Sequence, residues 1–174
     1  ADGTGAVDLR FVSALIEPGK PGLEGLPATF GENCRTLRVT LKDPCSNLQA
    51  ELLYNVFEDC DVIARTARLQ NLSLADLKIT GALSLCLELP DDQWDLVTLS
   101  GAWARERSVY RRPLVPEHQG VSTRCGASSL QQSPFLAVTR RDTSEQQGEA
   151  IGAALIYSGN FLALASVYQN RCAR

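Results

Sequence analysis

The longest alternating run in the chain extends from residue 76 to residue 89 and constrains the fold more than any other segment. Its odd-numbered positions are leucine or isoleucine, apart from Gly81, and its even-numbered positions are mostly polar. Successive side chains of a β-strand point to opposite faces, so this pattern predicts one strand with one buried face. Burial of its leucine-sized side chains would contribute on the order of 10 kcal/mol before chain entropy is subtracted. We expect residues 77–89 to form a core strand.

Other alternating or apolar segments, bounded by turn residues, are also typical of strands. They comprise residues 9–16, 36–42, 52–57, 62–69, 94–99 and 135–139. Residues 150–157 and 161–168 flank Ser158-Gly159-Asn160 and predict a β-hairpin. No segment of a dozen residues has a convincing 3.6-residue period. The sequence therefore predicts an all-β fold, a β-sandwich of antiparallel strands with long ordered loops.

Two segments predict such loops. Residues 17–27 contain three prolines and three glycines, which exclude both a helix and a central strand. We expect this segment to cross between sheets. Residues 113–134 have no sustained period and predict an ordered loop that carries Arg124, Ser128 and Ser129.

Residues 100–135 combine dense charge with aromatic rings. On an extended strand, Trp103, Arg105 and Arg107 would share one face. An aromatic ring followed by two guanidinium groups can stack, and can donate hydrogen bonds to carboxylates or sugar hydroxyls. A solvated strand edge is the simpler interpretation, because charged side chains protect exposed edges in many β proteins. Both interpretations stay open at this point.

The bulk composition is that of a globular protein. The chain has 174 residues, 44% hydrophobic and 21% charged, which predicts a single domain over residues 1–174. A net charge of −3 disfavours nucleic acid as a partner. The first residues predict neither a signal peptide nor a membrane anchor. The chain contains no methionine, so we expect a segment of a longer protein, truncated at both ends.

The six cysteines indicate neither a metal site nor a necessary disulfide framework. The closest two, Cys34 and Cys45, are 11 positions apart, and His118 is the single histidine. This spacing excludes common zinc motifs, and we expect no metal and no cofactor. Free thiols would indicate a reducing compartment, so we predict a cytoplasmic location.

Catalysis within the chain is not expected. Glycoside hydrolysis requires two suitably spaced carboxylates, and the acidic residues at 58–61 and 91–92 resemble ordinary solvated turns. No nucleophile elbow or phosphate-binding glycine loop is present in the sequence. We therefore predict no catalytic residue and no activity for the chain alone.

Several motifs carry a resemblance to a known family. They are Gly101-Ala102-Trp103-Ala104-Arg105-Glu106-Arg107, Arg112-Pro113-Leu114, Gly126-Ala127-Ser128-Ser129, Pro134-Phe135-Leu136-Ala137 and Tyr157-Ser158-Gly159-Asn160-Phe161-Leu162-Ala163. Together they resemble the amino-terminal β-supersandwich domain of family 36 α-galactosidases, in the family's order and over nearly the whole chain. Family members usually carry histidines where this chain has Leu130 and Gln132.

The resemblance implies a parent enzyme that hydrolyses terminal α-galactosides of the raffinose or melibiose type with retention. Its two catalytic aspartates would lie on a (β/α)₈ barrel, whose Lys-Trp-Asp motif is absent here. The implied partners are that barrel, neighbouring subunits and the parent's galactoside. In tetrameric members the sandwich helps to shape a neighbour's active-site entrance, and the implied contact residues are Trp103, Arg105, Arg107 and Arg124.

One alternative function stays open, and one physical expectation accompanies the fragment. The alternative is a free-standing carbohydrate-binding module with Trp103 or Trp94 as its stacking platform. We also expect unpaired edges or apolar surface at the terminal strands, in residues 1–16 and around Leu162, Leu164 and Tyr168. The isolated chain is therefore expected to self-associate.

Overall fold

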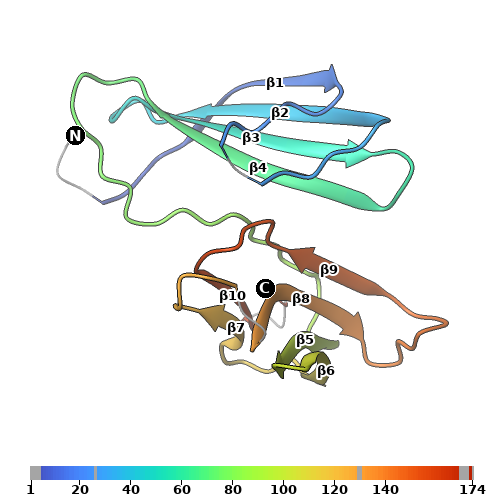
Figure 1. Ribbon diagram of the computed structural model, residues 1–174. Helices are drawn as coiled ribbons and strands as arrows, with labels where there is room; N and C mark the ends of the chain where they lie inside the picture. The colour runs from blue at the N-terminus through green and yellow to red at the C-terminus, as the bar shows by residue number, and fades with distance from the viewer. Residues whose placement is uncertain (1–4, 26, 129–130, 169–172, 174) are drawn as a thin grey trace. The chain divides into compact units, whose positions relative to one another are not determined.

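The computed structural model describes residues 5–25, 27–128, 131–168 and 173. Within these ranges the chain forms β-strands joined by turns and loops, with no helix, and every strand pairing is antiparallel. The predicted all-β class is confirmed. The chain divides into two compact units, Ala1–Leu85 and Cys86–Arg174, and each unit has its own sheets (Figure 1). The single domain over residues 1–174 stays a prediction.

The first unit is a four-stranded sheet in which the strands follow one another in chain order. Its strands are β1 (Arg10–Pro18), β2 (Cys34–Lys42), β3 (Leu48–Phe57) and β4 (Val62–Asn71). All four were predicted, with ends displaced by a few residues. Their pairing leaves β1 and β4 as the edges of the sheet.

The loop between β1 and β2 does not cross between sheets, so that prediction is wrong. Pro18 pairs with Arg35 at its base, which makes residues 19–33 a long hairpin connection within one sheet. Gly19, at φ 75°, turns the chain back, and its amide donates to the Cys34 carbonyl at 2.7 Å. Proline and glycine stop the strand here, but they do not determine the sheet to which the chain returns.

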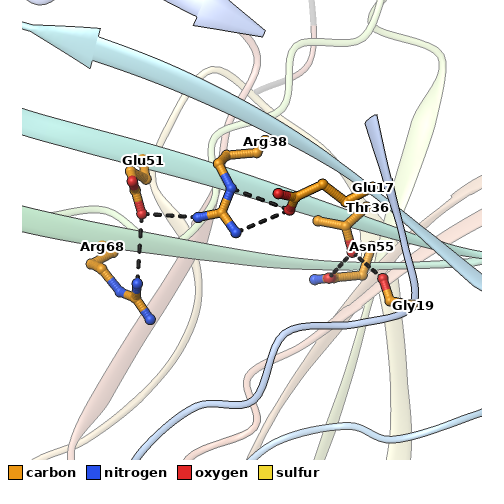
Figure 2. A network of polar contacts seen from close by, with 7 residues as sticks. All are labelled: Glu17, Gly19, Thr36, Arg38, Glu51, Asn55 and Arg68. Atoms are coloured by element: carbon orange, nitrogen blue, oxygen red, sulfur yellow. Dashed lines mark hydrogen bonds and ion pairs between the residues drawn. The ribbon is translucent and has the colours of Figure 1, made fainter. Parts of the chain in front are cut away.

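Two polar side chains lie at the buried centre of this sheet. Thr36 is 0% exposed and Asn55 is 2% exposed. The Thr36 hydroxyl lies 2.8 Å from Asn55 Oδ1 and 2.6 Å from the Gly19 carbonyl (Figure 2). Asn55 Nδ2 donates to the Ala64 carbonyl at 2.8 Å. Because an unpaired buried polar group is costly, these bonds fix β2, β3, β4 and the loop in one register.

A row of alternating charges crosses the same sheet (Figure 2). Arg38 on β2 binds Glu17 on β1 at 3.0 Å and Glu51 on β3 at 3.1 Å, and Arg68 on β4 lies 3.7 Å from Glu51. The hydrogen bond that Arg38 donates to Glu17, with the charges of both carboxylates, raises the pKa of the Arg38 guanidinium. The row aligns all four strands, and it leaves each charge with an opposite neighbour.

The predicted core strand at residues 77–89 is wrong. No strand ladder of the described chain includes residues 77–88, and most of their side chains are exposed, with Leu83 at 77%. The segment joins β4 to β5, which belong to different units. Its Ser84 carbonyl accepts a hydrogen bond from the Arg65 guanidinium. Its Leu89 forms a single antiparallel β-bridge with Ala173. An alternating pattern forms a strand only where a neighbouring strand supplies a ladder.

The second unit contains two sheets. Their strands are β5 (Trp94–Ala102), β6 (Arg105–Pro113), β7 (Gln119–Thr123), β8 (Gln132–Arg140), β9 (Ala150–Ala154) and β10 (Phe161–Ala165). One sheet has the order β6-β5-β8-β9, and the other pairs β10 with β7. Trp94, Leu96 and Val138 of the first sheet share one buried cluster with Ala165 of the second. The unit is therefore a small antiparallel sandwich.

Strand β7 lies inside the segment predicted as a continuous loop, residues 113–134. Its Val121 and Thr123 are buried, but its five residues include glycine, serine and threonine and carry little apolar signal. Gly120 permits the pairing, since a Cβ at this position would lie 1.9 Å from the Ala163 carbonyl oxygen. The strand is defined by its partner β10, which is distant in sequence.

The predicted hairpin of residues 150–168 is also wrong. β9 pairs with β8, whereas β10 pairs with β7 in the other sheet. The turn residues bind the loop after β7: the Ser158 carbonyl accepts from the Ser128 amide and Asn160 Oδ1 accepts from the Gly126 amide, both at 2.7 Å. Residues 155–160 therefore carry the chain from one sheet to the other.

Candidate functional site

The candidate site begins at the β5–β6 turn, where the predicted continuous strand is interrupted. Ala102 pairs with Arg105, so Trp103 and Ala104 form a two-residue turn. Ser100 pairs with Ser108, which leaves Gly101 opposite two residues of β6, a β-bulge. The expectation that Trp103, Arg105 and Arg107 share one face of an extended strand is therefore wrong. Alternation cannot reveal a turn this short, because a single bulge changes the side-chain phase.

The turn has a strained and well-defined backbone. Ala104 has φ 61° and Arg107 has φ 58°, in the left-handed region that costs a non-glycine residue roughly 1–2 kcal/mol. Glu106 Oε1 accepts a hydrogen bond from the Ala104 amide at 2.9 Å. A Cβ on residue 101 would lie 2.3 Å from the Arg105 carbonyl oxygen, so glycine is required there. These contacts fix the position from which Trp103 projects.

The two tryptophans have opposite environments. Trp103 is 84% exposed, whereas Trp94 is 1% exposed and lies beneath the Arg140 guanidinium, 3.8 Å from the ring centroid. Trp94 therefore cannot serve as a stacking platform, and that part of the carbohydrate-module alternative is wrong. Trp103 alone of the pair presents its ring to solvent.

An open groove of about 680 Å³ lies beside Trp103. One wall contains Trp103, Glu106 and Arg107 from the β5–β6 turn. The other contains Cys125 and Ser128 from the loop after β7, together with Pro134 of β8. Arg105 and Arg124 are exposed but do not line the groove, and Ser129 lies outside the described residues. Of the four predicted contact residues, the groove lining therefore includes Trp103 and Arg107 but not Arg105 or Arg124.

Hydrogen bonds hold the second wall in place. Asn160 and Ser158 bind the backbone of Gly126 and Ser128, as described above, and Gly126 has φ 79°. Gln132, one of the two positions where the resemblance led us to expect histidine, accepts from the Ser122 amide at 2.6 Å through its side chain. Leu130, the other such position, lies outside the described residues. The motifs at 101–107, 126–128 and 158–160 therefore build one region of the second unit.

Sequence reasoning missed the role of Glu106 and the participation of Ser128 in a groove. The glutamate stands between Arg105 and Arg107 in the sequence. Its spacing of two residues from Ala104 would indicate a local hydrogen bond only if the turn were already known. Pairing of the loop after β7 with the β9–β10 connection has no local sequence signal.

Elsewhere two of the acidic residues pair with polar or charged side chains that are distant in sequence. Both oxygens of Asp59 accept from Asn33 Nδ2, at 3.2 and 2.9 Å. Asp91 accepts from Arg140 at 2.6 Å, and this bond, with one from the Gln93 amide, lowers the pKa of Asp91. Among the described residues, no cluster of histidine, cysteine and acidic side chains could hold a metal ion. The same residues include no helix long and apolar enough to span a membrane.

Comparison with known proteins gives a consistent family. The family model described as "Glycosyl hydrolase family 36 N-terminal domain" matches residues 1–174. The α-galactosidase AgaA of Geobacillus stearothermophilus is 43% identical over 99% of this chain, and the α-galactosidase Mel36A of Lactobacillus acidophilus is 38% identical over 91%. The match spans 24% and 22% of those two relatives.

Solved structures agree with the sequence match. The crystal structure of the Geobacillus stearothermophilus AgaA superposes with a TM-score of 0.95 at 42% identity, over 99% of this chain and 24% of that one. The galactosidase domain of the α-galactosidase-sucrose kinase AgaSK superposes with a TM-score of 0.93 at 33% identity, over 98% of this chain. Related AgaA variants were solved in complex with stachyose and with raffinose.

Proposed function

Because the chain belongs to the glycosyl hydrolase family 36 N-terminal domains, we propose that it serves as the non-catalytic amino-terminal domain of an α-galactosidase. The observation that carries this proposal is the extent of the match, which covers the chain from end to end but only about 24% of AgaA. In that arrangement the catalytic carboxylates belong to the remaining part of the enzyme, and this chain supplies none of them.

The proposed parent hydrolyses terminal α-galactosides of the raffinose or melibiose type. The raffinose and stachyose complexes of AgaA variants support this substrate class. We propose that the two units act together as one domain that packs against the catalytic barrel and against neighbouring subunits. The exposed thiols of Cys45, Cys60 and Cys125 would suit a reducing, cytoplasmic setting.

The proposed contact with the barrel or the active-site rim lies at the β5–β6 turn. Trp103, Arg105, Arg107 and Arg124 are all exposed in this unit, which makes them available for such a contact. An exposed aromatic ring among arginines is the composition that protein interfaces favour at their energetic centres.

A domain exchange tests the function. Residues 1–174 would replace the matching segment of Geobacillus stearothermophilus AgaA, and turnover of an aryl α-galactoside and of raffinose would be measured. We expect the chimaera to be active and the isolated 174-residue chain to be inactive. A chimaera that folds by circular dichroism but has no turnover would contradict the proposal. So would turnover by the isolated chain that is abolished by mutating one of its own carboxylates.

A further inference from the structure

The outer edge of strand β6 has the composition of a binding surface. β6 is the first strand in the order β6-β5-β8-β9, and all nine of its residues, Arg105–Pro113, are exposed. We propose that this edge binds an acidic, extended segment of a partner protein, which adds to the sheet as a further strand. The inference goes beyond the proposed function, because it needs only β6 of the isolated chain and neither a barrel nor a sugar.

The backbone of β6 is available for a second ladder. One row of its amide and carbonyl groups pairs with β5, from Pro113 opposite Asp95 to Arg105 opposite Ala102. The other row points away from β5, because these groups alternate in direction along a strand. In the part of the chain that the structure describes, the backbone of residues 105–112 makes no hydrogen bond outside the β5 ladder. A strand of ordinary length can therefore pair along β6.

Three guanidinium groups on β6 lack a counter-charge. Among the described residues, the side chains of Arg105, Arg107 and Arg112 have no hydrogen-bond or ion-pair partner. Arg111 differs, since it binds Asp95 at 2.8 Å. The nine residues of β6 include four arginines and a single acidic residue, although the whole chain has a net charge of −3. Carboxylates of a partner strand would supply the missing negative charges, so charge complementarity favours an acidic segment.

Apolar contacts are available on both faces of the strand. Tyr110 and Arg112 share one face of β6, and Val109 lies on the other. Val109 is 69% exposed and Tyr110 is 55% exposed. Tyrosine and arginine are enriched at protein interfaces, and a guanidinium can bind a carboxylate through two parallel hydrogen bonds. Edges that only prevent pairing more often carry lysine or proline, or are very short.

A second copy of this chain is a poor occupant of the same edge. Two β6 strands would place arginines opposite arginines, which disfavours their pairing. The acidic residues at 58–61 lie in the turn between β3 and β4 and not in a free strand. The basic side chains therefore oppose self-pairing at this edge, and they admit a strand of opposite charge.

The test uses the 174-residue chain and a fluorescein-labelled peptide of about eight residues in which glutamate alternates with valine. Anisotropy of the label is measured while the chain is titrated. We expect saturable binding with a Kd on the order of 0.1–1 mM, weakened about threefold or more at high salt. Amide resonances of residues 108–112 are expected to shift. Arg112→Ala should weaken binding about threefold, and Arg112→Glu about tenfold or more, through loss and reversal of a charge.

Two peptides and one variant separate strand addition from simple charge attraction. In the first peptide, proline replaces each valine, which keeps the charge but removes half of the amide donors, and we expect it not to bind. In the second peptide, lysine replaces each glutamate, and we again expect no binding. Arg141→Ala removes an exposed arginine from the β8–β9 turn and is expected to leave binding unchanged.

Several results would overturn the inference. Equal binding of the proline peptide would show attraction without a ladder, and binding that survives Arg112→Glu would place the peptide elsewhere. Absence of saturable binding, or displacement by less DNA oligonucleotide than unlabelled peptide, would also contradict it. Self-association of the chain that is lost in Arg112→Glu would show that a second copy occupies the edge instead. The domain exchange above measures turnover, so either proposal can fail while the other survives.

Discussion

Arg140 connects three parts of the second unit through a single guanidinium. It stacks on the buried Trp94 ring at 3.8 Å, donates to Asp91 at 2.6 Å and donates to Glu149 at 3.0 Å. The hydrogen bonds with both carboxylates raise the pKa of Arg140, and the bond to Arg140 is the largest cause of the lowered pKa of Asp91. Arg140 thereby links Asp91, in the segment before β5, to Glu149, in the β8–β9 turn.

This lowered pKa predicts an acid dependence of stability. A carboxyl group whose pKa is lower in the folded state stabilises the fold above its unfolded pKa, and this contribution is lost as pH falls through the folded pKa. Unfolding by urea, measured at intervals from about pH 6 to pH 2, should show a smaller loss of stability in Asp91→Asn than in the parent chain. The pKa of Asp43 is also lowered, mainly by the hydrogen bond from the Cys45 amide. Asp43 therefore contributes to the acid dependence of stability in both proteins.

The exposed Asp142 supplies a matched control for this experiment. Asp142→Asn changes the same chemical group within the β8–β9 turn, and it is expected to leave the acid profile close to that of the parent chain. Equal acid slopes for Asp91→Asn and the parent would show that the bond to Arg140 does not contribute to the acid dependence.

At the scale of elements, the β5–β6 hairpin depends on one close backbone approach. A Cβ at residue 101 would lie 2.3 Å from the Arg105 carbonyl oxygen, whereas a Cβ at Gly81 would have no atom within 4 Å. Gly101→Ala must therefore displace the backbone of the turn, and we expect it to lower the free energy of unfolding by about 2 kcal/mol or more. Gly81→Ala is expected to change it by less than about 0.5 kcal/mol.

Chemical denaturation of the two glycine variants checks this contrast. Proton chemical shifts of the Trp103 indole report whether the turn itself has moved. An alanine at 101 that is tolerated as well as one at 81 would show that the bulge is not a constraint on the hairpin.

The elements differ in how far their sequence could predict them. β2, β3, β4 and β5 were predicted because each has neighbours adjacent in the chain or a strong apolar pattern of its own. Residues 77–89 have a stronger alternating pattern, but no strand ladder among the described residues includes positions 77–88. β7 has almost no pattern and forms because β10 lies beside it. Strand formation therefore depends on nonlocal pairing, which local periodicity does not report.

The candidate site shows the same limit. Sequence reasoning selected Trp103 and Arg107, because an exposed aromatic ring beside arginines differs from core composition. It also selected Arg105 and Arg124, which do not line the groove. The turn at Trp103 and Ala104 decides which side chains converge, and it depends on a left-handed φ at alanine, a residue that does not usually signal such a conformation.

At the scale of the whole chain, apolar side chains are exposed on strands with unpaired edges. β1 is an edge of the first sheet and exposes Phe11 at 66% and Ile16 at 60%. β10 pairs only with β7 among the described strands and exposes Leu162 at 68%. An unpaired edge with apolar side chains is a template for pairing with another chain. We therefore expect the isolated 174-residue chain to self-associate.

Sedimentation velocity across a concentration series tests this expectation, with association increasing at higher concentration. Phe11→Lys and Leu162→Lys each place a charge on one of the two edge strands, and each is expected to shift the chain toward monomer because a charged side chain opposes edge pairing. Trp103→Lys serves as the comparison, since Trp103 is more exposed than either but lies in a turn without a strand edge to offer. If Trp103→Lys dissociates the assemblies and the edge variants do not, the association surface is the β5–β6 turn. A parent chain that stays monomeric would instead show that neither edge strand pairs with another chain in solution.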